Sequence, residues 1–385
     1  MGDFIPLSVP NLCGRELEYI TRAVKDQWVS TGGSFITDFE KAVAAYVGTA
    51  GAVACQSGTA GLHLALVACG VGPGDEVIVP TLTFIASVNP VRYVGAYPVF
   101  MDCDDTLTMD PQKVEDFCSK CCHIENGKLY NNKTNRPVTA ILCVHVFGNL
   151  ADMEALASIA QRYHLKLIED ACEALGSRWE TGELVGKMAG TVSNIGVYSF
   201  NGNKIITTGG GGMIVSHDPE LLSCCKHLST QAKVDTVYFI HDAVGYNYRL
   251  TNLQAAMGLA QLELLEGFIA GKKERYEAYI REGFSLLPFR PGTRPNYWFY
   301  AYVTDRRDEC IRYLDKHDIQ TRPIWALLHT QEPYHDMETY RIEKAYDYYK
   351  RIVNIPCSTN LSDGEFDRVC SVLHSFEDMR GGRNP

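Results

Sequence analysis

The feature that most constrains the fold is an alternation of short apolar runs with amphipathic segments, beginning near Val53. Residues 138–146 form an apolar run of strand type, residues 152–163 carry apolar side chains at helical spacing, and residues 165–168 form a second apolar run. Strands that alternate with helices in this way build βαβ units. We therefore predict an α/β fold with a mostly parallel central sheet, helices on both faces, and ligands at the carboxyl ends of the strands.

Two amphipathic helices are predicted ahead of the sheet, over residues 14–29 and 35–47. Residues 105–136 are polar and predict a helix followed by a surface hairpin or loop. The first helix is expected to bury the apolar residues that recur along it at helical spacing: Leu17, Ile20, Val24 and Trp28.

The charge balance and the distribution of apolar residues exclude several functional classes. A net charge of −10 argues against a nucleic-acid partner, because phosphate-binding surfaces of that kind need a dominant basic patch. No apolar run approaches the roughly 20 residues needed to cross a bilayer. Met1 to Ser8 lack the basic and apolar regions of a signal peptide, so we expect a cytoplasmic protein without a membrane partner.

Fourteen cysteines raise the question of a metal or disulfide site, most clearly at Cys118, Cys121 and Cys122. A structural zinc site would need a second cluster with regular pair spacing, and the sequence has none. In a reducing compartment the thiols stay free. We therefore expect no metal, and we interpret most cysteines, such as Cys55 and Cys143, as small buried apolar residues.

Residues 197–215 contain two strand-type runs around a polar loop with one lysine, Lys204. The loop ends in four consecutive glycines, Gly209–Gly212, which allow the backbone to approach a ligand closely. An amine on such a scaffold can form a Schiff base with the aldehyde of pyridoxal phosphate. The alternative is a solvated surface lysine in a flexible turn.

Two further stretches have the chemistry of a phosphate and cofactor site. Ser57-Gly58-Thr59 follows a strand and begins a helix, whose free N–H groups and dipole suit a phosphate, although Ser and Thr also cap helices without a ligand. Asp170 ends a predicted strand, where a carboxylate can keep a pyridine nitrogen protonated, or can simply cap a helix.

The pattern Ser-Phe-x-x-x-Lys-x-x-Thr-Thr-Gly-x-Gly-Gly, from Ser199 to Gly212, resembles the cofactor-lysine segment of the DegT/StrS-type nucleotide-sugar aminotransferases. The resemblance extends almost end to end. It implies a transaminase of the aspartate aminotransferase fold (fold type I) with pyridoxal 5'-phosphate as cofactor. It further implies a large cofactor-binding domain over residues 1–266, including the N-terminal helix, and a smaller C-terminal α/β domain over residues 267–385.

The resemblance also implies roles for individual residues. Lys204 would tether the cofactor and move protons, and Asp170 would hold the pyridine nitrogen. Asn247, in Gly245-Tyr246-Asn247-Tyr248-Arg249, matches a residue that reaches the cofactor phosphate of the neighbouring subunit, which implies a homodimer with shared active sites; locally it reads equally well as a turn residue. The remaining cofactor-binding residues implied are Gly58, Thr59, Phe84, Glu173 and Ser199.

Two departures from the family pattern bear on the substrate. Gly210 stands where many members carry Glu, and Glu173 stands where Gln or His is commonest. This version of the loop resembles the branch that aminates 4-keto sugars on routes to bacillosamine- and legionaminic-type sugars. It implies L-glutamate as donor and a nucleotide-linked 2-acetamido-4-keto-2,6-dideoxyhexose as acceptor.

Substrate-binding residues are expected on both sides of the cofactor. Trp28 and Ser30 match the sugar-nucleotide region of the family, and a core tryptophan with a turn serine explains them equally well. Arg249 and Arg322 are candidates for binding the diphosphate, since guanidinium groups bind phosphate bidentately. Either arginine could instead be a structural ion-pair partner.

Four other functions compete with this prediction: a GDP-perosamine-type synthase acting on a 2-hydroxy sugar, a sugar 3-aminotransferase, a sugar 3-dehydratase, and a non-catalytic regulatory relative. Lys204 argues against the dehydratase, in which histidine replaces the lysine. The regulatory relatives are fused to DNA-binding domains, and no basic helix-turn-helix extension precedes Ile5.

Overall fold

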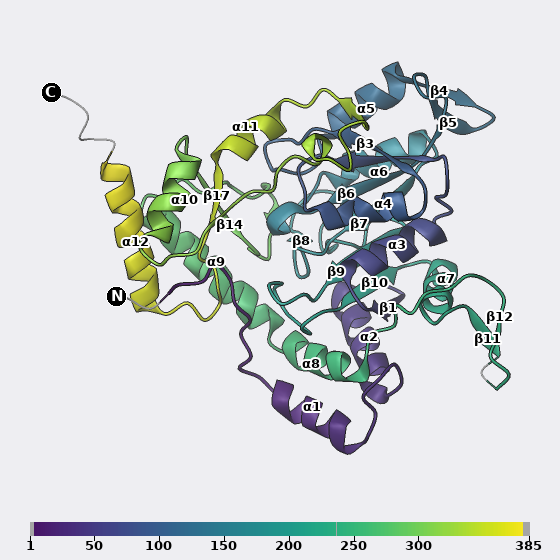
Figure 1. Ribbon diagram of the computed structural model, residues 1–385, viewed down its shortest axis with the longest axis horizontal. Coiled ribbons are helices and arrows are strands. Elements are labelled where there is room, and N and C mark those ends of the chain that lie inside the picture. The colour runs from purple at the N-terminus through teal and green to yellow at the C-terminus, as the bar shows by residue number, and fades with distance from the viewer. Residues whose placement is uncertain (1–3, 236, 380–385) are drawn as a thin grey trace.

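The computed structural model describes residues 4–235 and 237–379 (Figure 1). Its centre is a ten-stranded sheet whose main path runs in the order β1-β10-β9-β7-β6-β2-β3-β16. The strands of this path are β1 (Gly51–Cys55), β10 (Gly212–Ser216), β9 (Ile195–Ser199), β7 (Lys166–Asp170), β6 (Pro137–Val144), β2 (Glu76–Pro80), β3 (Tyr97–Met101) and β16 (Glu338–Tyr340). The strands β4 (Cys122–Glu125) and β5 (Lys128–Asn131) form a hairpin that pairs with β6.

Most neighbouring strands on this path are parallel, which confirms the predicted sheet. The pairs from β9 through β7, β6, β2 and β3 to β16 are all parallel, whereas β1 and β10, and β10 and β9, are antiparallel. The predicted helix and hairpin between residues 105 and 136 are confirmed as α5 (Pro111–Lys120) and the β4–β5 pair. Parallel strands end at one edge of a sheet, so the residues that follow β7 and β9 meet there.

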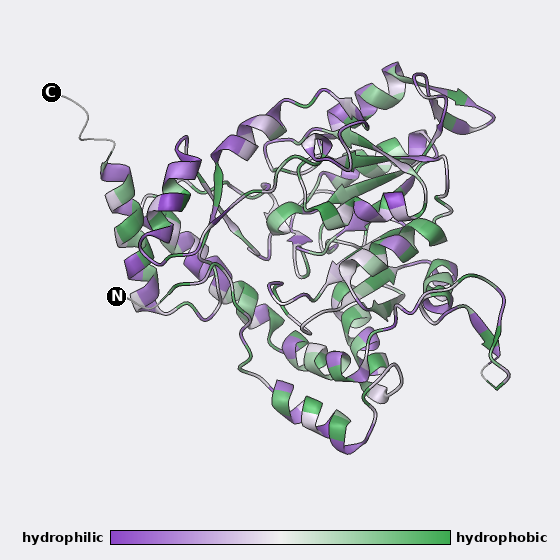
Figure 2. Ribbon diagram, in the orientation of Figure 1, coloured by the Kyte–Doolittle hydropathy of each residue, from purple (hydrophilic) through white to green (hydrophobic). Residues whose placement is uncertain are grey.

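Alternate side chains of the central strands enter two separate apolar cores. In β2, Val77 and Val79 belong to one core and Ile78 belongs to the other, and all three are buried. Burial on both faces explains why these strands are continuous apolar runs in the sequence. Figure 2 shows the central strands mainly in green and the outer helices in mixed colours.

Helices cover both faces of the sheet. The core that contains Ile78 is covered by α2 (Ser34–Val47), α5, α6 (Met153–Arg162) and α8 (Asn252–Leu262). The core that contains Val77 is covered by α3 (Gly58–Ala68), α4 (Asn89–Tyr93) and α7 (Pro219–Ser229). None of the described helices is long and apolar enough to cross a membrane.

The elements beyond α8, which we call the C-terminal unit, include a second and smaller sheet, and Figure 1 shows them in green to yellow. Its three-stranded antiparallel sheet consists of β14 (Tyr300–Val303), β17 (Ile352–Ile355) and β15 (Arg322–Pro323). Its helices are α9 (Leu265–Arg281), α10 (Arg307–Asp315), α11 (Lys344–Arg351) and α12 (Asp363–Asp378). The remaining elements are the short pairs β8 (Arg178–Trp179) with β13 (Thr293–Arg294) and β11 (Lys233–Asp235) with β12 (Ile240–His241), and the 3-10 turns η1 (Ile85–Ser87), η2 (Val146–Gly148) and η3 (Leu328–Thr330).

Short segments from each end of the chain pair with elements of the other unit. The strand β16 comes from the C-terminal part of the chain but pairs with β3 of the large sheet. In the opposite direction, Ile5 at the N-terminal end forms a bridge with Ile319, and the amide of Cys357 donates a hydrogen bond to the carbonyl of Leu7. The boundary between the units is therefore crossed at more than one place.

A buried carboxylate fastens the C-terminal unit to the end of β3. Asp102 is fully buried, and its oxygens accept hydrogen bonds from the backbone amides of Glu343, Lys344 and Ala345 at 2.8–2.9 Å. The ammonium of Lys113 lies 2.7 Å from the same carboxylate. Asp102 thus caps the N-terminus of α11, where free amides favour a negative charge.

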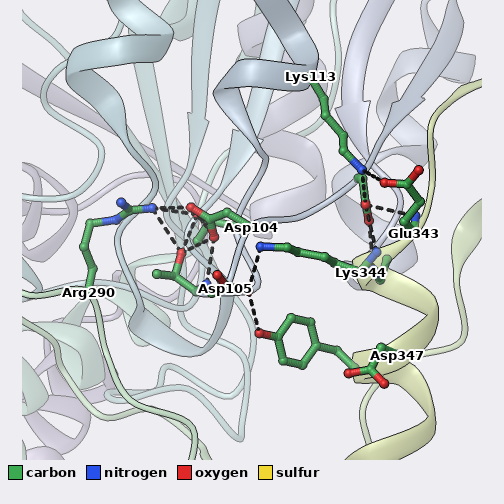
Figure 3. Close-up of polar contacts among 12 residues, drawn as sticks. Asp104, Asp105, Lys113, Arg290, Glu343, Lys344 and Asp347 are labelled. Atoms are coloured by element: carbon green, nitrogen blue, oxygen red, sulfur yellow. Dashed lines mark hydrogen bonds and ion pairs between the residues drawn. The ribbon is translucent and has the colours of Figure 1, made fainter.

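Nearby side chains extend this polar junction, as Figure 3 shows. The guanidinium of Arg290 lies 2.6 Å from the carboxylate of Asp104, and the ammonium of Lys344 lies 2.7 Å from that of Asp105. Both pairs join a loop after β3 to the C-terminal part of the chain.

Helix α1 (Glu16–Lys25) forms near the predicted position, but the prediction of its buried face was wrong. Leu17 is 80%, Val24 53% and Trp28 60% exposed, whereas Tyr19 and Ala23 are buried. The helix packs against α8, and the ring of Tyr19 lies 5.5 Å from that of Phe35. Tertiary packing therefore selects the stripe of Tyr19 and Ala23 and leaves the more apolar stripe at the surface of this chain.

Candidate active site

A cavity of about 390 Å³ lies at the carboxyl ends of β7 and β9. Parallel strands deliver their carboxyl ends to one edge of the sheet, which is why residues distant in sequence converge there. Its wall brings together seven of the residues predicted from the sequence: Gly58, Thr59, Phe84, Asp170, Glu173, Ser199 and Lys204.

The loop that carries Lys204 is fixed at both ends. The amide of Lys204 donates to the carbonyl of Asn201 at 3.0 Å, and the amide of Thr208 donates to the carbonyl of Phe200 at 2.9 Å. At the far end, a Cβ on Gly212 would lie 2.6 Å from the backbone carbon of Ser57. Glycine at position 212 is therefore required for β10 to pass the start of α3, whereas the sequence predicted that the glycine run approaches a ligand.

The amine of Lys204 lies between an aromatic ring and a carboxyl group. Its Nζ is 4.0 Å from the ring centroid of Trp298 and 3.8 Å from Oε1 of Glu173. The side chain is largely shielded from solvent. The lysine is thus a largely shielded side chain that lines the cavity, and the alternative of a solvated surface lysine does not apply.

Glu173 is held by the backbone on its other side. Its Oε2 accepts a hydrogen bond of 2.8 Å from the amide of Phe147, a residue with a left-handed backbone (φ 58°) in η2. Burial raises the pKa of Glu173 to about 7, against the opposing effect of the Lys204 charge. Glu173 can therefore hold or release a proton near neutral pH within reach of Lys204.

Asp170 ends β7 and is 3% exposed, with one oxygen accepting a 3.0 Å hydrogen bond from the amide of Cys172. The preceding residue, Glu169, is buried away from the cavity and bonded to the ring of His145 at 2.9 Å and to the amide of Gly190 at 2.8 Å. Burial opposes ionisation of Glu169, but the hydrogen bonds from His145 and backbone amides lower its pKa. The two adjacent acids thus differ: Glu169 is enclosed by protein donors, and Asp170 lines the cavity.

The N-terminus of α3 forms another part of the wall. The Oγ of Ser57 accepts a hydrogen bond of 3.1 Å from the amide of Ala60 and caps the helix. A Cβ on Gly58 would lie 2.5 Å from Sγ of Cys172 and 3.1 Å from Cβ of Ser199, so only glycine fits there. Ser57, Gly58, Thr59 and Ser199 line the same cavity, so a helix N-terminus and two further hydroxyl side chains are available for an anion.

Aromatic residues from the C-terminal unit close the opposite side, and these were not predicted as site residues. Trp298 is buried and stacks on Phe299 at 4.0 Å, and Trp325 lies 6.3 Å from the predicted ring of Phe84, which is half exposed. The sequence marked residues 298–303 only as a strand and residues 322–325 as irregular. The only available signal was two tryptophans in the C-terminal part, which is weak.

Trp28 and Ser30 lie outside the cavity wall, on an exposed loop. Asn252 at the start of α8 anchors this loop, since its amide donates to the carbonyl of Ser30 at 2.6 Å and its side chain donates to that of Trp28 at 2.7 Å. The loop is thus ordered without placing either side chain in this chain's own cavity.

Three other predicted residues also lie outside the wall. Asn247 is exposed, on a segment that runs beside the start of α3. Arg249 is buried and paired with Glu40 at 2.5 Å, which is the structural alternative considered for it. Arg322 is exposed in β15, three residues before Trp325 of the wall.

Comparison with known proteins decides the family. The profile of the DegT/DnrJ/EryC1/StrS aminotransferase family matches residues 10–374. The chain belongs to this family. The GDP-perosamine synthase of Escherichia coli O157:H7 is 37% identical over 381 residues, covering 97% of this chain and 98% of that protein. The GDP-perosamine synthase of Caulobacter vibrioides is 37% identical over 383 residues, covering 96% of this chain and 97% of that protein.

A solved structure agrees with the assignment. A DegT/DnrJ/EryC1/StrS aminotransferase from Brucella abortus superposes with a TM-score of 0.86 at 27% identity, covering 94% of this chain and 95% of that one. The predicted fold type I architecture and the predicted family are thereby confirmed.

Aminotransferases of the DegT/DnrJ/EryC1/StrS family use pyridoxal 5'-phosphate, and this member is a pyridoxal-phosphate-dependent transaminase. The residues present fit that cofactor. A largely shielded amine and a buried carboxylate line one cavity, and the N-terminus of α3 reaches the same wall at Gly58, where Cys172 and Ser199 pack too closely for any Cβ. These groups match the aldehyde, the ring nitrogen and the phosphate of the cofactor in chemical type.

Proposed function

We propose that this aminotransferase moves the amino group of L-glutamate to carbon 4 of a nucleotide-linked 4-keto-6-deoxy sugar. The observation that carries the proposal is the 37% identity, over nearly the whole chain, to relatives named GDP-perosamine synthase. Perosamine is an amino sugar, so these relatives place a sugar amine in the product. The pocket with Lys204, Asp170 and the α3 N-terminus supplies the chemistry that an amino transfer needs.

In this proposal the protein's own groups divide the work. The amides at the start of α3, with Gly58, Thr59 and Ser199, would bind the cofactor phosphate, and Phe84 would support the pyridine ring. The carboxylate of Asp170 would keep the ring nitrogen protonated. When bound, the cofactor supplies an electron-accepting ring for the carbon that loses its proton.

Lys204 would move the protons. With the cofactor bound, its Nζ would hold the cofactor between turnovers, take the proton from the substrate carbon, and deliver a proton to the carbon that becomes the new C–N centre. Positioned proton transfer of this kind contributes about two to four orders of magnitude in rate. Glu173, whose Oε1 lies 3.8 Å from Nζ, would hold a proton next to the bound cofactor, which would avoid repulsion between two negative charges.

Two acceptor sugars are candidates, each favoured by a different observation. The names of the relatives favour a GDP-linked sugar with a 2-hydroxyl group, which was the alternative to the first expectation from sequence. The loop with Gly210, together with Glu173, resembles the branch that uses a 2-acetamido-4-keto-2,6-dideoxyhexose. We favour the GDP-linked 2-hydroxy sugar, because whole-chain identity samples more of the site than one loop does.

A homodimer would complete this site. Exposed apolar side chains on α1 and around the β11–β12 pair, including Leu17, Tyr238 and Phe239, form surfaces that usually mark an interface. We propose that Asn247 reaches the partner's phosphate end, with Arg249 and Glu40 holding its segment in place. Trp28, Ser30 and Arg322 would then contact the sugar nucleotide.

The test is a product analysis. Purified protein with L-glutamate is offered GDP-linked and UDP-linked 4-keto-6-deoxy sugars with either a hydroxyl or an acetamido group at carbon 2, and products are identified by mass spectrometry. We expect an amino sugar from the GDP-linked 2-hydroxy substrate. Amination of the acetamido sugar alone would favour the second candidate, and a product aminated at carbon 3 would refute both.

The dimer is tested by mixing two inactive variants. Lys204→Ala lacks the proton-transfer group, and Asn247→Ala is expected to bind cofactor weakly. If Asn247 serves the partner's site, mixed dimers contain one site with both residues intact, and activity returns. No rescue despite demonstrated subunit exchange would assign Asn247 to its own subunit or to neither site.

A further inference from the structure

Trp298 contacts Lys204 and its loop through two different groups. The ring of Trp298 has the Nζ of Lys204 over it, 4.0 Å from the centroid. Its indole N–H donates a 2.7 Å hydrogen bond to the carbonyl of Asn203, the residue before the lysine. One side chain from the C-terminal unit therefore holds both the amine and the backbone of the catalytic loop.

We infer that Trp298 is a positioning residue for Lys204, which holds Nζ over its ring whenever Nζ carries a proton and fixes the loop through its N–H. The electron-rich face of an indole attracts a cation. Because a lysine that shuttles protons must stay in place after it releases the cofactor, it needs such a resting site. The inference rests on the proposed function for its catalytic consequence, but the contact itself can be tested without substrate.

Trp298 is itself rigidly held, as a positioning group must be. It is buried and stacks on Phe299 at an interplanar angle of 13°. Its amide donates to Oδ1 of Asn296 at 3.0 Å, and its carbonyl accepts a hydrogen bond of 3.0 Å from the buried ammonium of Lys272 in α9. The ring cannot follow the lysine, so it can serve as a fixed support.

The support works together with the charged groups that face the same amine. Glu173 lies 3.8 Å from Nζ, and Asp170 and Cys172 line the same cavity. Glu173 exchanges a proton near neutral pH, so its attraction for the ammonium varies with pH, whereas the attraction of the ring does not. Trp298 therefore provides the pH-independent part of the site that holds the amine.

The test measures the reactivity of Lys204 by chemical labelling. Full-length protein freed of cofactor is treated with a trace of acetic anhydride at pH 8, and the rate at which the Lys204 peptide is acetylated is followed by mass spectrometry. Only the neutral amine reacts, so the rate rises when the ammonium loses a stabilising contact. A rise that comes only from easier access of the reagent is measured by the control variant Trp325→Leu.

We expect Lys204 to be acetylated about 5- to 30-fold faster in Trp298→Leu, since losing a shielded cation–π contact changes the ratio of ammonium to amine by that factor. Trp298→Phe keeps a ring face and is expected to raise the rate by a much smaller factor. The matched control is Trp325→Leu, which removes a tryptophan from the same wall. Repeating the series with Glu173→Gln removes the neighbouring carboxyl group that can gain or lose a proton.

An unchanged acetylation rate of Lys204 in Trp298→Leu, or an equal rise in Trp325→Leu, would refute the inference that the ring of Trp298 holds the ammonium. Should the Leu variant not fold, Trp298→Met replaces it. For the N–H contact, Trp298→Phe is expected to lower kcat about tenfold with an unchanged KM for glutamate, because one positioning hydrogen bond is lost. A normal kcat in Trp298→Phe would refute the positioning role of the hydrogen bond from the indole N–H to Asn203. If Trp298→Leu changes the labelling of Lys204 as expected but the protein aminates no sugar, the proposed function is refuted and the role of Trp298 stands.

Discussion

Two aspartates of the large sheet show how surroundings separate a structural carboxylate from a functional one. Asp102 follows β3 and Asp170 ends β7, so both stand at carboxyl ends of parallel strands, and both are buried. Asp102 is bonded to Lys113 and to three backbone amides of the α11 start. Asp170 accepts a hydrogen bond from the amide of Cys172 and lines the cavity.

The difference is one of partners. The charge of Asp102 is neutralised by protein donors, so its role is complete within the chain. Asp170 lines a cavity that fits a cofactor, and a carboxylate buried there is stable only because a protonated ring nitrogen or water can meet it. Position at a strand end alone therefore does not identify a catalytic acid.

The largest expected effect is on the catalytic side of this comparison. Asp170→Asn should lower kcat about 100- to 1000-fold, the range found for removing one preorganised electrostatic group, while the free energy of unfolding of the apoprotein stays nearly constant. Steady-state kinetics and urea unfolding measure the two quantities. A normal kcat, or a large decrease in the free energy of unfolding, would contradict the assignment of Asp170 as a functional rather than a structural carboxylate.

Asp102→Asn should show the reverse pattern. Removing one partner of a buried ion pair leaves the other charge uncompensated and costs about 3–5 kcal/mol. We expect a loss of that order in the free energy of unfolding, measured in urea, with kcat of the folded fraction within a few-fold of the original. A variant of normal stability would show that the amides of α11 do not depend on this charge.

Glu173 should make the free energy of unfolding depend on pH. Its pKa in the folded protein is raised to about 7 by burial, above an ordinary value of 4.5. The folded state thus binds more protons between these values, and stability present below about pH 4.5 should be lost as pH rises to about 7. The loss is on the order of 3 kcal/mol.

The control for this effect is Glu173→Gln, which cannot titrate. The difference in unfolding free energy between the two proteins should therefore change with pH over this window and be constant above it. A difference that is flat from pH 4.5 to 7 would show that Glu173 titrates as an exposed carboxylate does.

The smallest effect is expected at the partly exposed pair of Asp104 and Arg290 (Figure 3). This pair belongs to the same junction as Asp102 but is screened by solvent, so Asp104→Asn should cost only about 1 kcal/mol. Thermal or urea unfolding checks it, with Asp347→Asn on the exposed face of α11 as control. If Asp104→Asn lowers the free energy of unfolding as much as Asp102→Asn does, then burial does not determine how much each carboxylate contributes to stability.

Much of the fold and the site could be predicted because the signals are local. The strand-and-helix alternation predicted the parallel sheet, and the strands that flank Lys204 placed its loop at the sheet edge. Gly58 and Gly212 stand out in the local sequence, although it did not indicate that Gly58 packs on Cys172 and Gly212 on Ser57. These features depend on residues near one another in the chain.

The remainder depends on packing between distant segments. The wall residues Trp298 and Trp325 reach the cavity only because the C-terminal unit folds back onto the large sheet. The strand β16 is three residues long and has no periodicity of its own. The buried stripe of α1 was chosen by its contact with α8, against the apolar pattern within the helix. Nothing in the local sequence indicates such contacts.

The cap that Asp102 provides to α11 has a consequence for the order of events during synthesis. Its amide partner at Glu343 lies 241 positions further along the chain. Before the C-terminal segment has been synthesised, Asp102 has no amide partners from α11, and β3 cannot pair with β16. Ile5 likewise has no partner until Ile319 has been made. The binding pocket, whose wall contains Trp298 and Trp325, is therefore completed only after the C-terminal part of the chain has been synthesised.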